Sequence, residues 1–82
     1  MKKSAKKYKS LVLVSTGNDW EGLFVDGKKV YEHHEVSNQL ISKWSAKTGL
    51  VIEKKWTTAE ETSKTEDCGC FPELLKDMEL ED

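Results

Sequence analysis

The chain has 82 residues, of which 34% are charged and 37% hydrophobic, and its net charge is −2. A chain of this length buries only about 60% of its unfolded surface, which predicts one small domain without room for an elaborate catalytic cleft. No apolar run approaches the ~20 residues of a membrane span, and the run at residues 11–14 is shorter than the roughly seven residues of a secretory signal core. We therefore expect a cytoplasmic protein.

Charge is segregated along the chain. Residues 1–10 contain five lysines and no acidic residue, residues 11–58 are neutral, and residues 59–82 contain nine acidic residues and two lysines. We predict a flexible basic arm (1–10), an α+β core domain (11–58) and an acidic tail (59–82) with a short helix at 72–79. The lysines of the arm are Lys2, Lys3, Lys6, Lys7 and Lys9.

The first predicted element is a strand at residues 11–15, where a continuous apolar run suggests burial on both faces. A β-hairpin follows at residues 20–33, with its turn at Asp26 and Gly27. This dipeptide between β-prone runs is a strong hairpin signal, because a type I′ turn needs positive φ at both central residues.

A two-residue loop predicts the register of this hairpin. Val25 would face Lys28, and Leu23 would face Val30. One face would then carry Trp20, Phe24 and Tyr31, with His33 opposite Trp20 and Tyr31 covering Gly22; Leu23 and Val30 would lie on the other face. Glu21 and Glu32 would be opposed.

Apolar residues at helical spacing predict an amphipathic helix at residues 36–48, capped by Ser37 or Glu35 at its start and by Gly49 at its end. Residues 50–56 read as a fourth strand, with Leu50, Ile52 and Trp56 on one side.

The remaining residues give weaker signals. Thr57 and Thr58 each have a glutamate three residues later, a capping-box pattern, but no apolar stripe follows, so any helix there is expected to be short. We read residues 66–70 as a linker. Residues 72–79 carry a short apolar stripe with Pro72 at the first helical position.

These elements predict an α+β two-layer sandwich of order β-β-β-α-β, with a short C-terminal helix. The mixed four-stranded sheet would have the order 4-1-2-3, with the fourth strand parallel to the first. The helix would cover one face of the sheet. The other face would be covered by the terminal helix or left free for a partner, and the sequence leaves both possibilities open.

Candidate chemistry is sparse. Cys68 and Cys70 could contribute two ligands to a metal site, but zinc needs two more, so reduced thiols in a linker are the simpler interpretation. His33, His34 and Glu35 could form an acid–base cluster, although no nucleophile stands at a defined spacing from them. There is no glycine-rich phosphate loop. We expect no enzymatic activity and no cofactor.

The stretch from Asn18 to His33 (NDWEGLFVDGKKVYEH) resembles small uncharacterised proteins of phages and bacteria that share the pattern D-W-E-G-L-[YF]-V-D-G-K-x-V-x-E-x-H. The resemblance covers about a fifth of the chain closely and implies no catalytic residues. It marks Asp19, Glu21 and His33, around Trp20, as candidates for a contact surface.

The sequence thus predicts a non-catalytic interaction module, such as an early phage protein that modulates a host protein. The candidate partner-binding residues are Trp20, Phe24, Tyr31, Asp19, Glu21 and His33. One alternative is nucleic-acid association through the lysine arm, which the absence of arginine disfavours. Another is an acidic tail that mimics nucleic acid. The protein would be a monomer or a homodimer.

Overall fold

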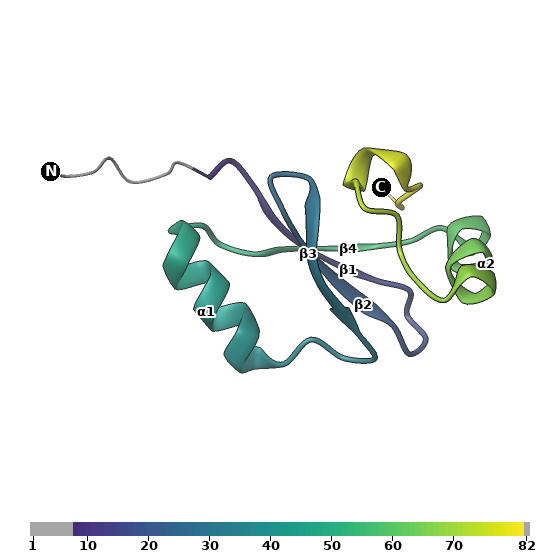
Figure 1. Cartoon of the computed structure of the whole chain (residues 1–82), viewed down its shortest axis with the longest axis horizontal. Coiled ribbons are helices and arrows are strands. Elements are labelled where there is room, and N and C mark those ends of the chain that lie inside the picture. Colours follow the sequence, from purple (N-terminus) through teal and green to yellow (C-terminus); the bar gives the residue numbers. More distant parts are fainter. Residues whose placement is uncertain (1–7, 82) are drawn as a thin grey trace, which may run out of the picture.

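The computed structural model describes residues 8–81 and forms one mixed four-stranded sheet flanked by helices (Figure 1). The elements are β1 (Leu11–Ser15), β2 (Glu21–Val25), β3 (Lys28–His33), α1 (Asn38–Thr48), β4 (Glu53–Trp56), α2 (Ala59–Cys68) and a 3-10 turn (Leu75–Asp77). The strand order is β3-β2-β1-β4, and β4 runs parallel to β1 while the other pairs are antiparallel. The predicted α+β class, strand order and mixed sheet are confirmed. The predicted flexible arm falls largely on residues 1–7, outside the described residues.

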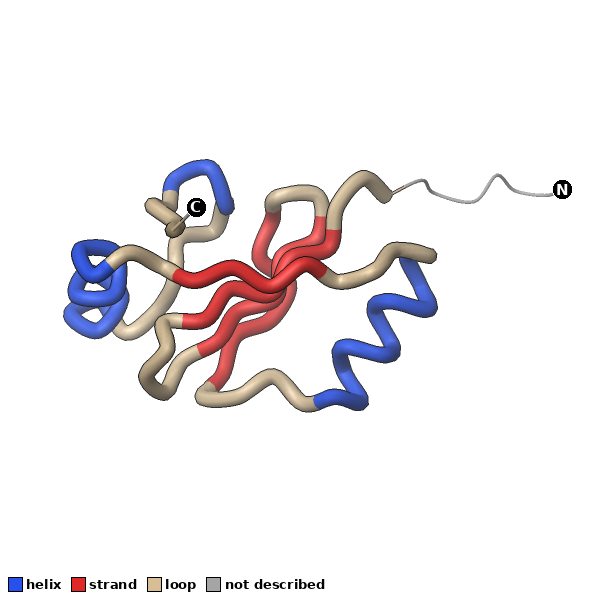
Figure 2. Tube along the Cα trace, turned by 180° about the vertical axis from the view of Figure 1, so that it is seen from behind, coloured by secondary structure: helices blue, strands red, loops and turns tan. Residues whose placement is uncertain are grey.

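The central strand, β1, is buried along its whole length, as its continuous apolar run predicted. Its two faces belong to two cores. Leu11 packs with Leu23 and Val25 beneath α1, whereas Val12 and Val14 pack with residues of the C-terminal segment, residues 70–81. Figure 2 shows α1 and the C-terminal segment on opposite sides of the strands. Both faces of the central strands β1 and β2 are therefore covered by this chain itself, whereas the outer strands β3 and β4 stay largely exposed.

The hairpin turns at the predicted dipeptide. Asp26 has φ 55° and Gly27 has φ 81°, the positive values that a type I′ turn requires. The side chain of Asp26 also accepts hydrogen bonds from the backbone N–H groups of Lys9 (2.6 Å) and Ser10 (3.1 Å). The aspartate therefore fixes both the turn and the entry into β1.

A β-bulge makes the predicted register wrong beyond Phe24. Val25 and Phe24 pair with Lys28 and Lys29 as expected, but Leu23 then pairs with Tyr31 rather than Val30. Because side chains alternate between faces, one extra residue moves every later side chain to the other face. Tyr31 consequently leaves the face of Phe24.

The bulge also separates the two glutamates that were expected to oppose each other. Glu32 pairs with Gly22, and Glu21 pairs with His33. Glu21 instead accepts a hydrogen bond from the backbone N–H of Val36 (3.0 Å). The expected like-charge repulsion is thereby removed.

Helix α1 ends at Thr48 as predicted but begins at Asn38, two residues later than predicted. Ser37, rather than Glu35, is its N-cap and accepts a hydrogen bond from Leu40 N (3.2 Å), and Gly49 ends the helix at φ 74°. Strand β4 is shorter than predicted. Leu50 and Ile52 lie before it and pack on the α1 side of the sheet, whereas Trp56 is 45% exposed.

Helix α2 was underestimated from the sequence. The Thr58 hydroxyl caps it by accepting from Glu61 N (3.2 Å), as the capping-box pattern indicated, but the helix extends into the expected linker (66–70) and ends at Cys68. Its buried side is polar. Glu61 is 4% exposed and accepts a hydrogen bond from Glu79 N (3.0 Å), so its burial depends on a residue 18 positions away. A search for apolar stripes cannot detect such a helix.

The predicted terminal helix at 72–79 was wrong. The C-terminal segment is mostly extended, with a single 3-10 turn at Leu75–Asp77. Its backbone pairs with both outer strands: Glu73 O accepts from Lys29 N (2.8 Å), and Glu81 N donates to Trp56 O (2.8 Å). These bonds replace those of a helix that would be marginal at about nine residues.

Candidate functional site

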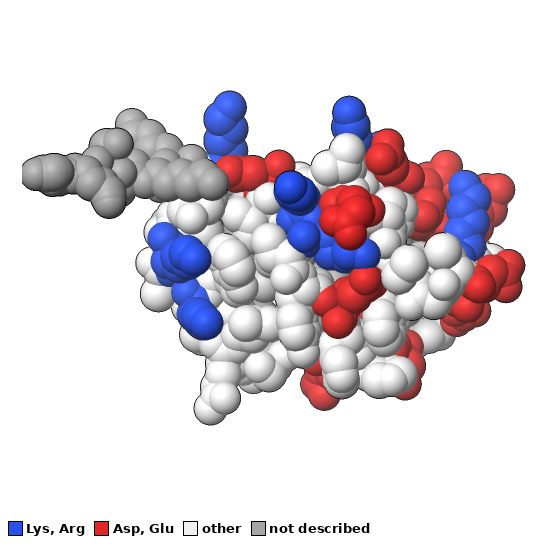
Figure 3. All heavy atoms as spheres, in the orientation of Figure 1, with Lys and Arg blue, Asp and Glu red and all other residues white. Residues whose placement is uncertain are grey.

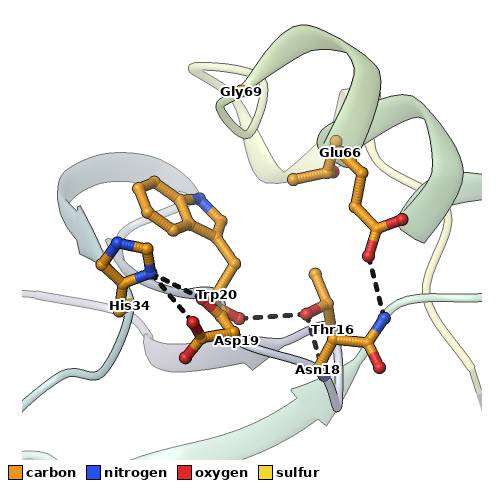
Figure 4. Close-up of a pocket in the computed structure, with 8 residues that line it drawn as sticks. Thr16, Asn18, Asp19, Trp20, His34, Glu66 and Gly69 are labelled. Carbon is orange, nitrogen blue, oxygen red and sulfur yellow. Dashed lines mark hydrogen bonds and ion pairs between the residues drawn. The ribbon is translucent and has the colours of Figure 1, made fainter.

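A hollow of about 270 Å³ opens between the β1–β2 loop and α2 (Figure 4). We call it the Trp20 pocket. It is lined by Thr16, Asn18, Asp19, Trp20, His34, Thr65, Glu66 and Gly69. The pocket therefore joins the hairpin region that the sequence marked as a contact surface to the C-terminal part of the chain.

Trp20 and His34 form one wall of the pocket. Their rings meet edge to face, with centroids 5.3 Å apart and an interplanar angle of 89°. His34 Nδ1 lies 3.2 Å from Asp19 Oδ2 and 3.2 Å from the Asp19 carbonyl oxygen. Because a carbonyl oxygen can only accept, Nδ1 carries the proton in this contact. The imidazole is thus anchored to the residue that precedes Trp20.

Helix α2 supplies the opposite wall. Asn18 Nδ2 donates to Glu66 Oε2 (2.9 Å) and links the loop to the helix across the pocket. Thr65 is 3% exposed, and its hydroxyl has no hydrogen-bond partner in the part of the chain that the structure describes. An unpaired buried hydroxyl is unfavourable, and this oxygen exposes less than 1 Å² of surface.

The charge of the lining is negative. Asp19 and Glu66 contribute carboxylates, and no lysine belongs to the lining within residues 8–81. Figure 3 shows that the acidic side chains of the visible face lie mostly toward the end of the molecule that holds α2. The local field of the pocket therefore favours a cation over an anion.

Glu32 holds the tryptophan in place. Its carboxylate accepts hydrogen bonds from Trp20 Nε1 (3.1 Å), from Phe71 N (2.9 Å) and from Lys29 Nζ (2.5 Å). Desolvation acts to raise the pKa of Glu32, but the bonds from these three donors outweigh it and lower the pKa below its usual value. The bulge makes this arrangement possible, because it places Lys29 and Glu32 on one face despite their spacing of three residues.

Lys29 is the cation of this cluster. Desolvation acts to lower its pKa, but the hydrogen bond to Glu32 and the negative charges of Glu32 and Glu73 raise it above the usual value. Its ammonium also donates to the carbonyl oxygen of Phe71 (2.9 Å). Lys29 thus ties β3 to the C-terminal segment.

The structure brings together two of the six candidate residues. Asp19 and Trp20 line the pocket. Phe24 is fully buried and packs against Phe71, with ring centroids 6.2 Å apart, so it presents no surface to a partner. Tyr31 is 39% exposed. It lies on the opposite face from Phe24, so the expected shared face of Trp20, Phe24 and Tyr31 was wrong.

The two other candidates also lie outside the pocket lining. His33 stacks on Tyr31, with centroids 6.2 Å apart and rings inclined by 22°. Glu21 contacts the backbone of Val36 and lies 4.0 Å from Lys54 Nζ. These residues organise the junction between β3 and α1.

Six of the eight lining residues were not assigned to the contact surface from the sequence, among them His34, Thr65 and Glu66. His34 stood out only as a member of an acid–base cluster with His33 and Glu35, and its carboxylate partner proves to be Asp19. Thr65 and Glu66 gave no usable signal, because α2 lacks an apolar stripe and its contact with the hairpin is a long-range one.

Cys68 and Cys70 are free thiols whose sulfur atoms lie 3.7 Å apart. The hydrogen bond with Cys68 raises the pKa of the Cys70 thiol above its usual value. Across residues 8–81, no group of three or more histidine, cysteine, aspartate or glutamate side chains is placed to hold a metal ion.

Lys9 is exposed, and the other four lysines of the predicted arm lie outside the described residues. Among the helices of residues 8–81, none combines the length and the apolar character needed to cross a membrane. Comparisons of the chain with protein-family models, with curated proteins and with solved structures gave no match.

Proposed function

We propose that this protein is a small non-catalytic interaction module that binds a partner protein at the Trp20 pocket. The observation that carries the proposal is the convergence of Trp20, Asp19 and Glu66 around a hollow on the surface. Aromatic and charged side chains around a concave site are typical anchors in protein recognition.

The chemistry of the lining favours binding over catalysis. The Thr16 hydroxyl bonds to the carbonyl oxygen of Trp20 (3.4 Å) and accepts from Asn18 N (3.1 Å). His34 directs Nδ1 at Asp19. Nucleophilic catalysis needs a nucleophile within hydrogen-bond reach of its base, and these polar groups bond to the loop itself instead.

The resemblance of residues 18–33 to small phage and bacterial proteins points to a partner from a bacterial host. In that setting the module would be an early phage protein that binds a host protein and alters its activity. The resemblance includes Asp19 and Trp20, the two residues through which the hairpin region reaches the pocket.

The proposal is tested by filling the pocket with a neutral side chain. Asn18 is exposed on the pocket rim, so Asn18→Trp should obstruct the hollow without altering its charge. Asn38→Trp is the matched control, since Asn38 is exposed in the first turn of α1 and is not part of the lining.

The tagged protein and both variants would be used to capture partners from bacterial lysate, with folding checked by circular dichroism. We expect a saturable partner that is retained by the parent and by Asn38→Trp but lost by Asn18→Trp. Equal capture by all three proteins would refute the assignment of binding to the Trp20 pocket.

A further inference from the structure

The Trp20 pocket has the charge, the aromatic wall and the size of a site for a cationic side chain. Resting on the proposed function, we propose that the pocket binds a lysine or arginine side chain of the partner protein.

Charge complementarity is the first argument. Asp19 and Glu66 stand on opposite sides of the hollow, one in the loop before β2 and the other on α2 (Figure 4). Glu66 is already in contact with Asn18 through one oxygen, Oε2, and this leaves its second oxygen for a further donor. An anionic ligand would instead meet two negative charges at close range, which disfavours phosphate or carboxylate groups.

The aromatic wall is the second argument. Ammonium and guanidinium groups are attracted to indole rings at distances up to about 6 Å, and this attraction strengthens when the site is partly desolvated. Trp20 is half-buried, and its Nε1 bond to Glu32 fixes the ring. The aliphatic part of a lysine or arginine side chain can pack on this ring while its charged end reaches a carboxylate.

The size of the hollow also suits an extended side chain. Its 270 Å³ is several times the volume of about 30 Å³ that one water occupies in the liquid, which suits an extended side chain better than a single ion. The Thr65 hydroxyl is a buried polar group without a partner among the described residues. Its oxygen exposes less than 1 Å², so a ligand N–H would bond to it only after the pocket wall shifts.

The test uses two short blocked peptides that differ at one position, acetyl-Gly-Ala-Lys-Ala-Gly-amide and the same peptide with norleucine in place of lysine. Binding to the full chain is followed by nuclear magnetic resonance through the indole N–H of Trp20 and the amide of Gly69. We expect saturable shifts with the lysine peptide that weaken as salt is added, and none with the norleucine peptide.

Two isosteric substitutions test which carboxylate the lysine peptide contacts. Glu66→Gln removes one charge from the lining, and Asp67→Asn removes one charge from the neighbouring exposed residue of α2. We expect about fivefold weaker binding of the lysine peptide by Glu66→Gln, and a change of less than about twofold by Asp67→Asn. Equal binding of both peptides, or equal effects of both variants, would overturn the cation assignment.

The outcome separates this inference from the proposed function. If Asn18→Trp abolishes partner capture and Glu66→Gln leaves it unchanged, the Trp20 pocket remains the interaction site. The assignment of a cationic ligand to the pocket is then refuted. The chain could instead associate with itself at low salt, with Glu66→Gln abolishing that association. This result would identify a second copy of this lysine-rich chain as the occupant, and would overturn the assignment to a different protein.

Discussion

Replacing Glu32 by glutamine tests the buried cluster that supports the Trp20 pocket. The two hydrogen bonds from Trp20 and Phe71 reach Oε1, and the bond from Lys29 reaches Oε2. A glutamine that keeps its oxygen toward Trp20 and Phe71 turns its amide nitrogen toward the lysine ammonium. Two donors then face each other, so the bond from Lys29 is lost.

The magnitude follows from the burial of this pair. The side chains of Lys29 and Glu32 are 12% and 19% exposed, so solvent screens the pair only partly. A hydrogen bond that involves a charged group contributes roughly 1.5–3 kcal/mol, and we expect Glu32→Gln to lower the free energy of unfolding by about 2 kcal/mol at neutral pH. A chain of this length has a total stability of about 4–12 kcal/mol, so the effect is readily measured.

The effect should depend on pH in a defined direction. The bonds from Lys29, Phe71 and Trp20 outweigh desolvation and hold the pKa of Glu32 below its usual value of 4.5 in the folded protein. A lowered folded pKa adds stability that is present above the unfolded pKa and is lost as pH falls through the folded pKa. The difference between parent and variant should therefore be largest near neutral pH and should shrink below about pH 4.5.

Urea denaturation followed by circular dichroism measures both effects. Glu73→Gln is the control, because Glu73 Oε1 lies 3.8 Å from the same lysine but the Glu73 side chain is 72% exposed. We expect Glu73→Gln to change the free energy of unfolding by less than about 1 kcal/mol. A Glu32→Gln effect no larger than that of the control, or one that does not change with pH, would refute the reasoning.

Three further predictions concern the C-terminal segment. Phe71→Ala should lower the free energy of unfolding by about 3–5 kcal/mol in urea titrations, because Phe71 is 1% exposed in the core, and an effect below about 1 kcal/mol would contradict its role there. Gly22→Ala should lower the free energy of unfolding by about 1–3 kcal/mol, since a Cβ at this position would lie 2.5 Å from Phe71 Cδ2. This loss should nearly vanish when Phe71→Ala is also present, and additive effects of the two substitutions would exclude this contact as the cause. Cys68→Ala should speed alkylation of Cys70 by iodoacetamide at about pH 8, measured by mass spectrometry, because the hydrogen bond that raises the Cys70 pKa is removed; an unchanged rate would refute that cause.

Elements that depend on neighbouring residues could be predicted from the sequence. The buried run of β1, the Asp26–Gly27 turn and the caps of α1 at Ser37 and Gly49 each depend on residues within a few positions of one another. Local hydrogen bonding and backbone conformational preference are properties of short segments, so their patterns carry through to the folded chain.

Features that depend on distant residues were missed or misplaced. The register of β3 changed at Val30, the extra residue of the bulge, which turns Glu32 toward Trp20 and Phe71. No pattern within the hairpin predicts this, because one of the donors that satisfy Glu32 lies 39 residues further along the chain.

The candidate site was likewise predicted only in part from the sequence. The sequence marked Asp19 and Trp20 through the resemblance of the hairpin, but Thr65 and Glu66 became part of the site only when α2 packed beside the β1–β2 loop. The sequence by itself determined the strands, the turn and the capped helix, because short-range bonding specifies them. Only the tertiary structure decided the strand register, the fold of the C-terminal segment and the Trp20 pocket, since each arises where buried polar groups of distant segments satisfy one another.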